Sequence, residues 1–129
     1  GLGGGVSTRG WIVARGLAQS ARVLEVHGAK VRTLAGLGGV GEVFVTAQGV
    51  ESPDYDLGLA LARGEPFDVA LAGIGRSCEG PSVARCIAEL TRSRGVIAPI
   101  FTAVTEIVDG RRPPIEALRE FFLSAPTEI

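Results

Sequence analysis

The sequence lacks the residue types that most metal and redox sites require. Among its 129 residues there is no methionine, one histidine (His27), and two cysteines, Cys78 and Cys86, which are eight positions apart. This spacing fits neither a redox Cys-x-x-Cys pair nor a zinc-ligand pair, and His27 has no partner. We therefore expect no metal site, two free thiols and a reducing compartment, the cytoplasm. The absence of methionine indicates that the chain is part of a longer translation product.

The chain also lacks an excess of charge of one sign and any long apolar run. The formal net charge is -1, with acids and bases interspersed, so no face is basic enough to bind a nucleic-acid backbone. No apolar run approaches the roughly 20 residues that span a bilayer, and we expect no signal peptide. Lysine is the cation most easily tuned into a general base. The only lysine, Lys30, lies in an expected surface turn.

Apolar residues recur at three- and four-residue steps, the pattern of helices that bury one face. The clearest helices are one capped by Ser7 or Thr8 and ended by Gly28, and three that begin at Pro81, at Pro99 and at Pro113-Pro114. Shorter helices are expected over 54–63, closed by Gly64, and over 67–71, ahead of Gly73; residues 42–46 fit a helix or a strand. Because no alternating segment of useful length is present, the sequence predicts one all-α domain over 1–129.

A glycine-rich segment at 36–41 matches the dinucleotide-binding pattern G-x-G-x-x-G. That pattern requires a buried apolar strand before it, and residues 29–34 do not form one. We therefore interpret the segment as a glycine turn between helices. Residues Gly3–Gly5 could hold a phosphate at the start of the first helix, although a flexible connector fits their composition better.

Several charged residues allow a functional and a structural interpretation. Glu42 follows the glycine turn, where it could orient a substrate hydroxyl or a base, or complement a helix dipole; the sequence favours neither. Glu79, just before the Pro81 helix, could accept a hydrogen bond from a ribose hydroxyl, but the dipole role is favoured. Arg9 and Arg15 could bind an anion. They do not share a helix face, so we expect at least one to be solvated or packed against a neighbouring helix.

Four motifs occur in a fixed order along the chain. They are Gly1–Arg9 with the helix segment Ala14–Ala18, then Thr33–Glu42, then Ser77–Gly80, and finally Ala98-Pro99-Ile100 with Glu106-Ile107 and Asp109-Gly110. In this order and spacing they resemble the C-terminal domain of the NAD(P)-dependent glycerol-3-phosphate dehydrogenase family over essentially the whole chain.

The resemblance implies a helical bundle-like substrate-binding and dimerisation domain of a two-domain dehydrogenase. Members transfer a hydride between NAD or NADP and C2 of glycerol 3-phosphate, which gives dihydroxyacetone phosphate for glycerophospholipid metabolism. The Rossmann domain and the general-base lysine would lie before Gly1. The chain itself would then hold no catalytic residue, would be inactive alone, and would belong to a homodimer whose partners are a small-molecule substrate and its own Rossmann domain.

The resemblance also implies site residues. Glu42 replaces a substrate-site aspartate, Thr46 matches a threonine one turn later, and Ser52 matches a substrate-loop serine. Ser77 and Glu79 lie where the family contacts the cofactor.

The chain departs from the family after Ser52, where Pro53 and Asp54 replace an arginine and an asparagine that hold phosphate and cofactor. Ser7 likewise replaces an asparagine. Two alternatives therefore stay open: a non-catalytic binding or scaffold relative, and a dehydrogenase of the same fold that acts on a different hydroxy acid, with Arg9 or Arg15 binding the anion.

Overall fold

The computed structural model describes residues 1–49 and 51–124. Within these residues it contains eight α-helices, one π-helical turn and no strand, which confirms the all-α prediction. The elements are α1 (Val6–Val26), α2 (Val31–Leu34), η1 (Leu37–Gly41), α3 (Glu42–Ala47), α4 (Pro53–Ala62), α5 (Phe67–Ile74), α6 (Gly80–Arg94), α7 (Pro99–Val108) and α8 (Pro114–Leu123). No helix in the described part of the chain is long and apolar enough to cross a membrane.

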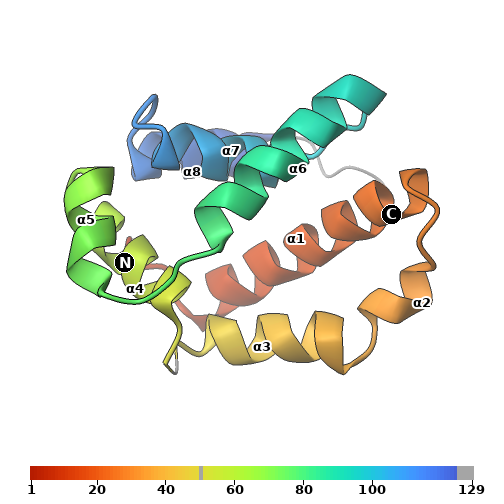
Figure 1. Cartoon of the computed structure of the whole chain (residues 1–129), viewed down its shortest axis with the longest axis horizontal. Helices are drawn as coiled ribbons and strands as arrows, with labels where there is room; N and C mark the ends of the chain where they lie inside the picture. The colour runs from red at the N-terminus through yellow and green to blue at the C-terminus, as the bar shows by residue number, and fades with distance from the viewer. Residues whose placement is uncertain (50, 125–129) are drawn as a thin grey trace.

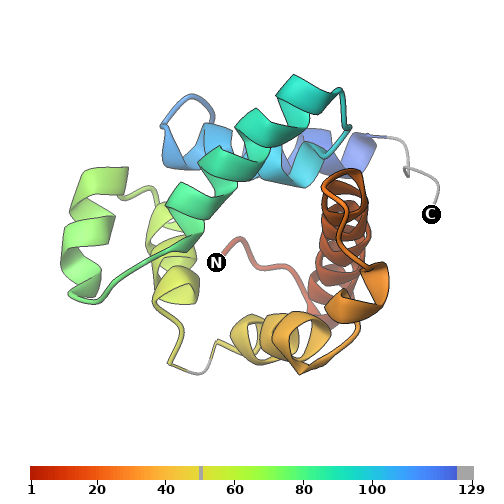
Figure 2. The same cartoon turned by 45° about the vertical axis from the view of Figure 1, so that its right-hand side comes forward.

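The long helix α1 separates two groups of helices (Figures 1 and 2). Helices α6, α7 and α8 lie together on one side of it, and α3 runs along the other side. Helices α4 and α5 form one end of the molecule, and α2 lies at the opposite end. The first residues reach α4, where a side chain on Gly1 would overlap that of Ala62.

Proline and glycine set most helix boundaries as the sequence predicts. Proline occupies the first turn of α4, α6, α7 and α8, where its missing N–H costs no intrahelical hydrogen bond. Gly28 and Gly64 adopt φ angles of 78° and 87° just beyond the ends of α1 and α4. In both cases the following residue donates a hydrogen bond to a carbonyl five positions earlier, which is a Schellman motif.

Two predicted boundaries are wrong. Helix α1 begins at Val6 with Gly5 as its N-cap and no side-chain cap, so Ser7 and Thr8 lie inside the first turn. Helix α5 continues through Gly73 to Ile74 and ends at Gly75, whose φ is 63°. The physical reason is burial: Ile74 packs against the core cluster shared with α4, and this contact outweighs the cost of about 1 kcal/mol for a glycine inside a helix.

The core consists of two clusters that meet at α7. The first joins α4, α5 and α7 through buried residues: Leu57, Ala60, Leu61, Ala70 and Val108. The second joins α7 and α8 through Ala103, Ala117 and Phe121, with Ile12 of α1 packed against it. Because α7 contributes to both clusters, its position fixes the two halves of the domain relative to each other.

A buried glutamine links α1 to α7. Gln19 is 1% exposed, and its Oε1 accepts a hydrogen bond from the backbone N–H of Ile100 at 2.9 Å. That N–H is in the first turn of α7, which has no side-chain cap at its own N-cap, Ala98. Gln19 therefore satisfies one of the N–H groups that a helix leaves unpaired at its start.

We expect Gln19→Ala to lower the free energy of unfolding by about 2 kcal/mol, because it leaves a cavity and an unpaired N–H at the start of α7. Urea denaturation followed by circular dichroism measures this change. Gln48→Ala is the matched control, since Gln48 is exposed at the end of α3 and its loss should cost little. Equal stabilities of the two variants would contradict the role of Gln19.

Candidate functional site

The glycine-rich segment leads directly into α3, the helix that carries Glu42 and Thr46. Residues 37–41 form the π-helical turn η1, and α2, not a strand, lies before them. The dinucleotide-binding alternative is therefore excluded, and the expected turn is itself helical. A Cβ at Gly39 would overlap the carbonyl oxygen of Leu34, so only glycine allows this close approach of η1 to α2.

Glu42 and Thr46 lie one turn apart on α3 and so share a face of that helix. Glu42 is exposed in the first turn, where its carboxylate also complements the helix dipole. Thr46 is half-buried. The structure thus places the two side chains on one helix, where the sequence left residues 42–46 open between a helix and a strand.

Ser52 is the N-cap of α4, and its Oγ accepts a hydrogen bond from the backbone N–H of Tyr55 at 3.2 Å. The hydroxyl can still donate its own hydrogen to a ligand. The preceding residue, Glu51, has a φ of 52°, a left-handed conformation that costs energy for a residue other than glycine. Ser52 is therefore presented from a strained loop.

The loop between α5 and α6 is bonded to the start of α4 by two side chains. Asp54 Oδ1 accepts a hydrogen bond from the backbone N–H of Gly80 at 3.0 Å. Arg76 donates to Asp56 Oδ2 at 2.8 Å and to the carbonyl oxygen of Glu51 at 3.0 Å. We name this region, residues 51–56 together with residues 76–80, the serine-loop site.

The serine-loop site unites Ser52 with the two predicted cofactor residues. Ser77 and Glu79 belong to the bonded loop and are exposed, and Glu79 is the N-cap of α6 without a side-chain capping bond. In the described part of the chain, no hydrogen bond or ion pair joins Glu42 or Thr46 to this site. The five predicted residues therefore form two groups, one on α3 and one at the serine-loop site.

Sequence reasoning missed Arg76 entirely and noted Asp54 only as a departure from the family pattern. The partners of Arg76 are 20 and 25 positions away along the chain, and Gly80 is 26 positions from Asp54. Contacts of this length leave no trace in helical periodicity. The only local indication of these contacts was the pair of acids, Asp54 and Asp56, that follows Ser52.

The serine-loop site carries more negative than positive charge. It contains the carboxylates of Glu51, Asp54, Asp56 and Glu79 and one cation, Arg76. The same surroundings act on Cys78, one of the two free thiols. Burial raises the pKa of the Cys78 thiol, the nearby Asp54 carboxylate raises it further, and Arg76 opposes them.

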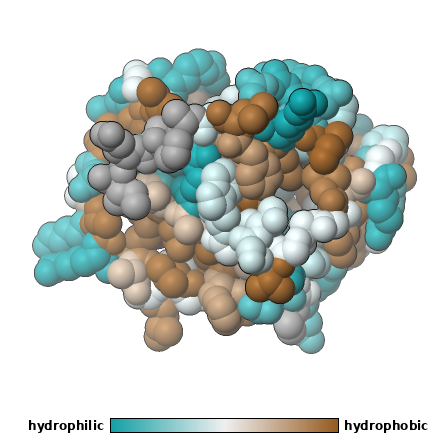
Figure 3. Space-filling model, turned by 180° about the vertical axis from the view of Figure 1, so that it is seen from behind, coloured by the Kyte–Doolittle hydropathy of each residue, from teal (hydrophilic) through white to brown (hydrophobic). Residues whose placement is uncertain are grey.

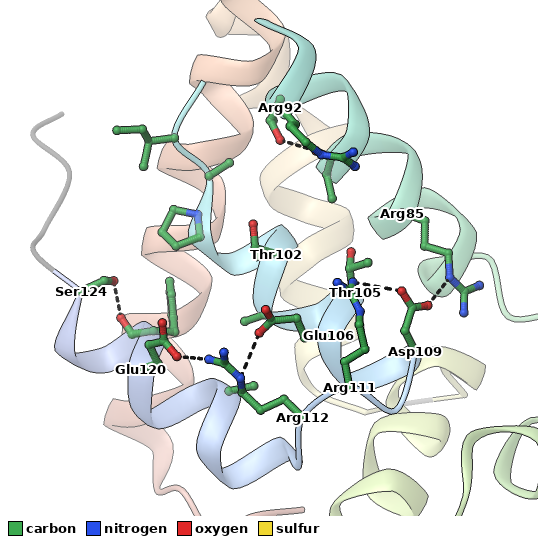
Figure 4. Close-up of a pocket in the computed structure, with 18 of the residues that line it drawn as sticks. Arg85, Arg92, Thr102, Thr105, Glu106, Asp109, Arg111, Arg112, Glu120 and Ser124 are labelled. Atoms are coloured by element: carbon green, nitrogen blue, oxygen red, sulfur yellow. Dashed lines mark hydrogen bonds and ion pairs between the residues drawn. The ribbon is translucent and has the colours of Figure 1, made fainter. Parts of the chain in front are cut away.

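A separate groove lies between α6, α7 and α8, with a volume of about 830 Å³. Its walls carry ion pairs that Figure 4 shows: Asp109 pairs with Arg85 at 2.7 Å and with Arg111 at 3.1 Å, and Arg112 bridges Glu106 and Glu120. The hydrogen bond from Arg85 lowers the pKa of Asp109. Because these charges neutralise each other and no predicted site residue lines the groove, we assign it to the packing of the three helices.

Arg15 has a packing role. Its guanidinium lies 4.7 Å from the ring centre of Trp11 and 4.6 Å from that of Phe121, and it donates to the carbonyl oxygen of Phe121 at 3.2 Å. These contacts fix α1 against α8 and confirm that at least one of Arg9 and Arg15 packs against a neighbouring helix.

The fold is shared with a solved dehydrogenase. The crystal structure of glycerol-3-phosphate dehydrogenase from Coxiella burnetii superposes with a TM-score of 0.88 at 28% sequence identity. The match covers 93% of this chain and 37% of that one. The class of protein is therefore an all-α domain of a dehydrogenase.

The family model described as the NAD-dependent glycerol-3-phosphate dehydrogenase C-terminus matches residues 1–119, and the chain belongs to this family. It is 38% identical over 120 residues to glycerol-3-phosphate dehydrogenase [NAD(P)+] from Wolinella succinogenes, covering 93% of this chain and 40% of that protein. The corresponding protein from Methylococcus capsulatus is 37% identical over 126 residues, covering 98% and 38%. The chain thus spans about two fifths of the length of these relatives.

We expect Gly80→Ala to weaken the attachment of the α5–α6 loop. A Cβ at this position would lie 2.7 Å from Asp54 Oδ1, so the carboxylate must move and its hydrogen bond is lost, at a cost of about 1–2 kcal/mol. Gly73→Ala is the control, because its Cβ would meet no atom within 4 Å and alanine favours a helix. Urea denaturation should show Gly80→Ala destabilised and Gly73→Ala unchanged or stabilised; the reverse order would contradict the proposed contact.

Cys78 should alkylate more slowly at pH 8 than a cysteine in an unstructured peptide, because its raised pKa leaves less of the reactive thiolate. The rate with iodoacetamide, measured against pH in a Cys86→Ser background, should rise at higher pH than for the peptide. Adding Asp54→Asn removes a carboxylate that disfavours the thiolate and should move the curve towards lower pH. An unchanged curve would show that Asp54 does not act on this thiol.

Proposed function

We propose that residues 1–129 form the substrate-binding and dimerisation domain of an NAD(P)-dependent glycerol-3-phosphate dehydrogenase. The complete protein would interconvert glycerol 3-phosphate and dihydroxyacetone phosphate. The observation that carries this proposal is the family match over residues 1–119, together with a fold that positions Ser52 beside the loop of Ser77 and Glu79.

In this proposal the chain binds and orients substrate but does not supply the base. Glu42 and Thr46 would bind the hydroxyl groups of the substrate from one face of α3, and Ser52 would donate a hydrogen bond from the start of α4. Lys30, the only lysine, is the N-cap of the short helix α2 and is exposed. As the family resemblance implies, we expect the catalytic lysine in the Rossmann domain and no activity from this chain alone.

Ser77 and Glu79 have the chemistry to contact the cofactor. Both side chains are exposed, and a serine hydroxyl and a carboxylate are suitable partners for ribose hydroxyls. When bound, NAD or NADP exchanges the hydride with C2 of the substrate. We expect the Rossmann domain to provide most of the cofactor contacts and to decide between NAD and NADP.

An apolar surface over η1 and α3 fits the Rossmann domain as its partner. Leu37, Val40, Phe44 and Val45 are between 43% and 92% exposed, and hydrophobic residues gather along the corresponding edge in Figure 3. Contiguous apolar surface of this kind marks an interaction site. Because Glu42 lies within the same segment, closure of the Rossmann domain over it would place the substrate between the domains.

The complete protein has an expected oligomeric state and an expected location. We expect a homodimer, by analogy with other helical dehydrogenase domains. The cytoplasm is the expected location, because both cysteines are free and thiols persist in a reducing compartment.

The acidic serine-loop site favours a second candidate function. Pro53 and Asp54 stand where the family has a cation and an amide, and a phosphate dianion is repelled by the surrounding carboxylates. A dehydrogenase of this fold with another hydroxy-acid substrate, or a non-catalytic relative, would fit that charge. Arg15 is held by its ring contacts, which leaves Arg9 as the better candidate on α1 for an acid group.

The direct test is oxidation of NADH and NADPH by the full-length protein in the presence of dihydroxyacetone phosphate, with the 129-residue chain as the blank. We expect turnover by the full-length protein only, because the base and most cofactor contacts lie outside this chain. Turnover with another 2-keto compound but not with dihydroxyacetone phosphate would favour the altered substrate. No turnover with any keto substrate would favour the non-catalytic relative.

A further inference from the structure

We propose that Arg76 recognises the phosphate group of the substrate and replaces the arginine that the serine loop lacks. This inference rests on the proposed function and names the residue that sets its specificity for a phosphorylated substrate.

Arg76 is positioned to contact the serine loop. The guanidinium reaches the serine loop from the α5–α6 loop, and its Nη1 donates to the carbonyl oxygen of Glu51 at 3.0 Å. Glu51 directly precedes Ser52, the N-cap of α4. A cation therefore stands beside the serine even though Pro53 and Asp54 supply none. Within residues 51–58 and 75–80 the sequence contains no other lysine or arginine.

Arg76 forms an exposed ion pair with Asp56. Its Nη2 donates to Asp56 Oδ2 at 2.8 Å, and the two side chains are 47% and 43% exposed. An exposed ion pair of this kind contributes little to stability. A phosphate dianion carries more charge than the Asp56 carboxylate and can accept from Nη2–H and Nε–H together, while Nη1 stays on the carbonyl oxygen of Glu51. Asp56 is thus an internal competitor, which the phosphate displaces from Arg76.

Asp54 and Asp56 have different hydrogen-bond partners. The Asp54 carboxylate accepts from the backbone N–H of Gly80 at 3.0 Å and lies at the start of α6, where the helix dipole favours negative charge. Asp54 is therefore engaged by the backbone rather than by Arg76. Of the two acids in the first turn of α4, only Asp56 competes for the guanidinium.

Two measurements on the full-length protein test this assignment. The first is the ratio of kcat/KM for dihydroxyacetone phosphate to kcat/KM for unphosphorylated dihydroxyacetone. The second is the Kd of inorganic phosphate, followed by phosphorus NMR, which does not depend on turnover. Both are made on Arg76→Ala, Arg76→Lys and Asp56→Asn.

Arg76→Ala should lower the ratio and weaken phosphate binding by about tenfold or more, the effect of losing a hydrogen bond to a charged group. Phosphate binding and the kcat/KM ratio of Arg76→Lys should lie between those of Arg76→Ala and the wild type, because lysine keeps the charge but cannot donate two parallel hydrogen bonds. Asp56→Asn should tighten phosphate binding by about threefold, since the competing carboxylate is removed. If the pair served only to hold the loop, Asp56→Asn would instead weaken binding, and the proposal would be overturned.

Arg63→Ala is the matched control. Arg63 also belongs to an exposed ion pair, with Glu65 at 3.2 Å, but it lies seven residues beyond Asp56, or about 10 Å along the helix. Loss of its charge should leave both measurements unchanged. Equal effects of Arg63→Ala and Arg76→Ala, or no phosphate binding by the wild type, would overturn the assignment.

The two measurements also separate this inference from the proposed function. A full-length protein that fails to reduce dihydroxyacetone phosphate, yet loses phosphate binding in Arg76→Ala and gains it in Asp56→Asn, would refute the dehydrogenase and support Arg76. Turnover that Arg76→Ala reduces equally for both substrates would support the dehydrogenase and refute Arg76.

Discussion

The packing of α7 is the constraint on which the rest of the domain depends. This short helix supplies Val108 to the cluster of α4 and α5 and Ala103 to the cluster of α8, and its first turn is hydrogen-bonded to Gln19 of α1. Small residues at these contacts allow close approach of the helices, because an alanine leaves room for the neighbouring backbone. Once α7 is fixed, α1 and α4 are fixed relative to each other, and so are the segments that carry the candidate site.

The candidate site depends on a smaller set of interactions that are polar and local. Asp54 and Arg76 attach the α5–α6 loop to the start of α4, through the backbone N–H of Gly80 and the carbonyl oxygen of Glu51. Glu51, next to Ser52, holds a left-handed conformation. The apolar clusters bring α4 and α5 together, but they do not determine where this loop lies. Two charged side chains perform that task, so the geometry around Ser52 depends on hydrogen bonds rather than on the core.

Periodicity and helix-breaking residues predicted the fold well because the information they use is local. The starts of α6, α7 and α8 follow from proline, and the ends of α1 and α4 follow from glycine. The path of α5 through Gly73 was not predictable, because the packing of Ile74 against the core cluster of α4, α5 and α7 decides it. At the site, the sequence order identified Ser52, Ser77 and Glu79 as candidates, but the contacts of Arg76 arise only when segments 20 or more residues apart come together.

The charge of the serine-loop site connects the family assignment with the departure from the family pattern. An arginine on the serine loop, as in the family pattern, would place a cation directly after Ser52. Here the only cation within residues 51–58 and 75–80 is Arg76, which comes from the α5–α6 loop and pairs with Asp56. If Arg76 binds the phosphate as we propose, a cation shared in this way would bind it less tightly than a dedicated one, because the phosphate must first displace a carboxylate. An uncharged ligand could not separate Arg76 from Asp56, so the same pair would favour a phosphorylated ligand. In this proposal, loss of the loop arginine would weaken phosphate binding and keep the preference for a phosphorylated substrate.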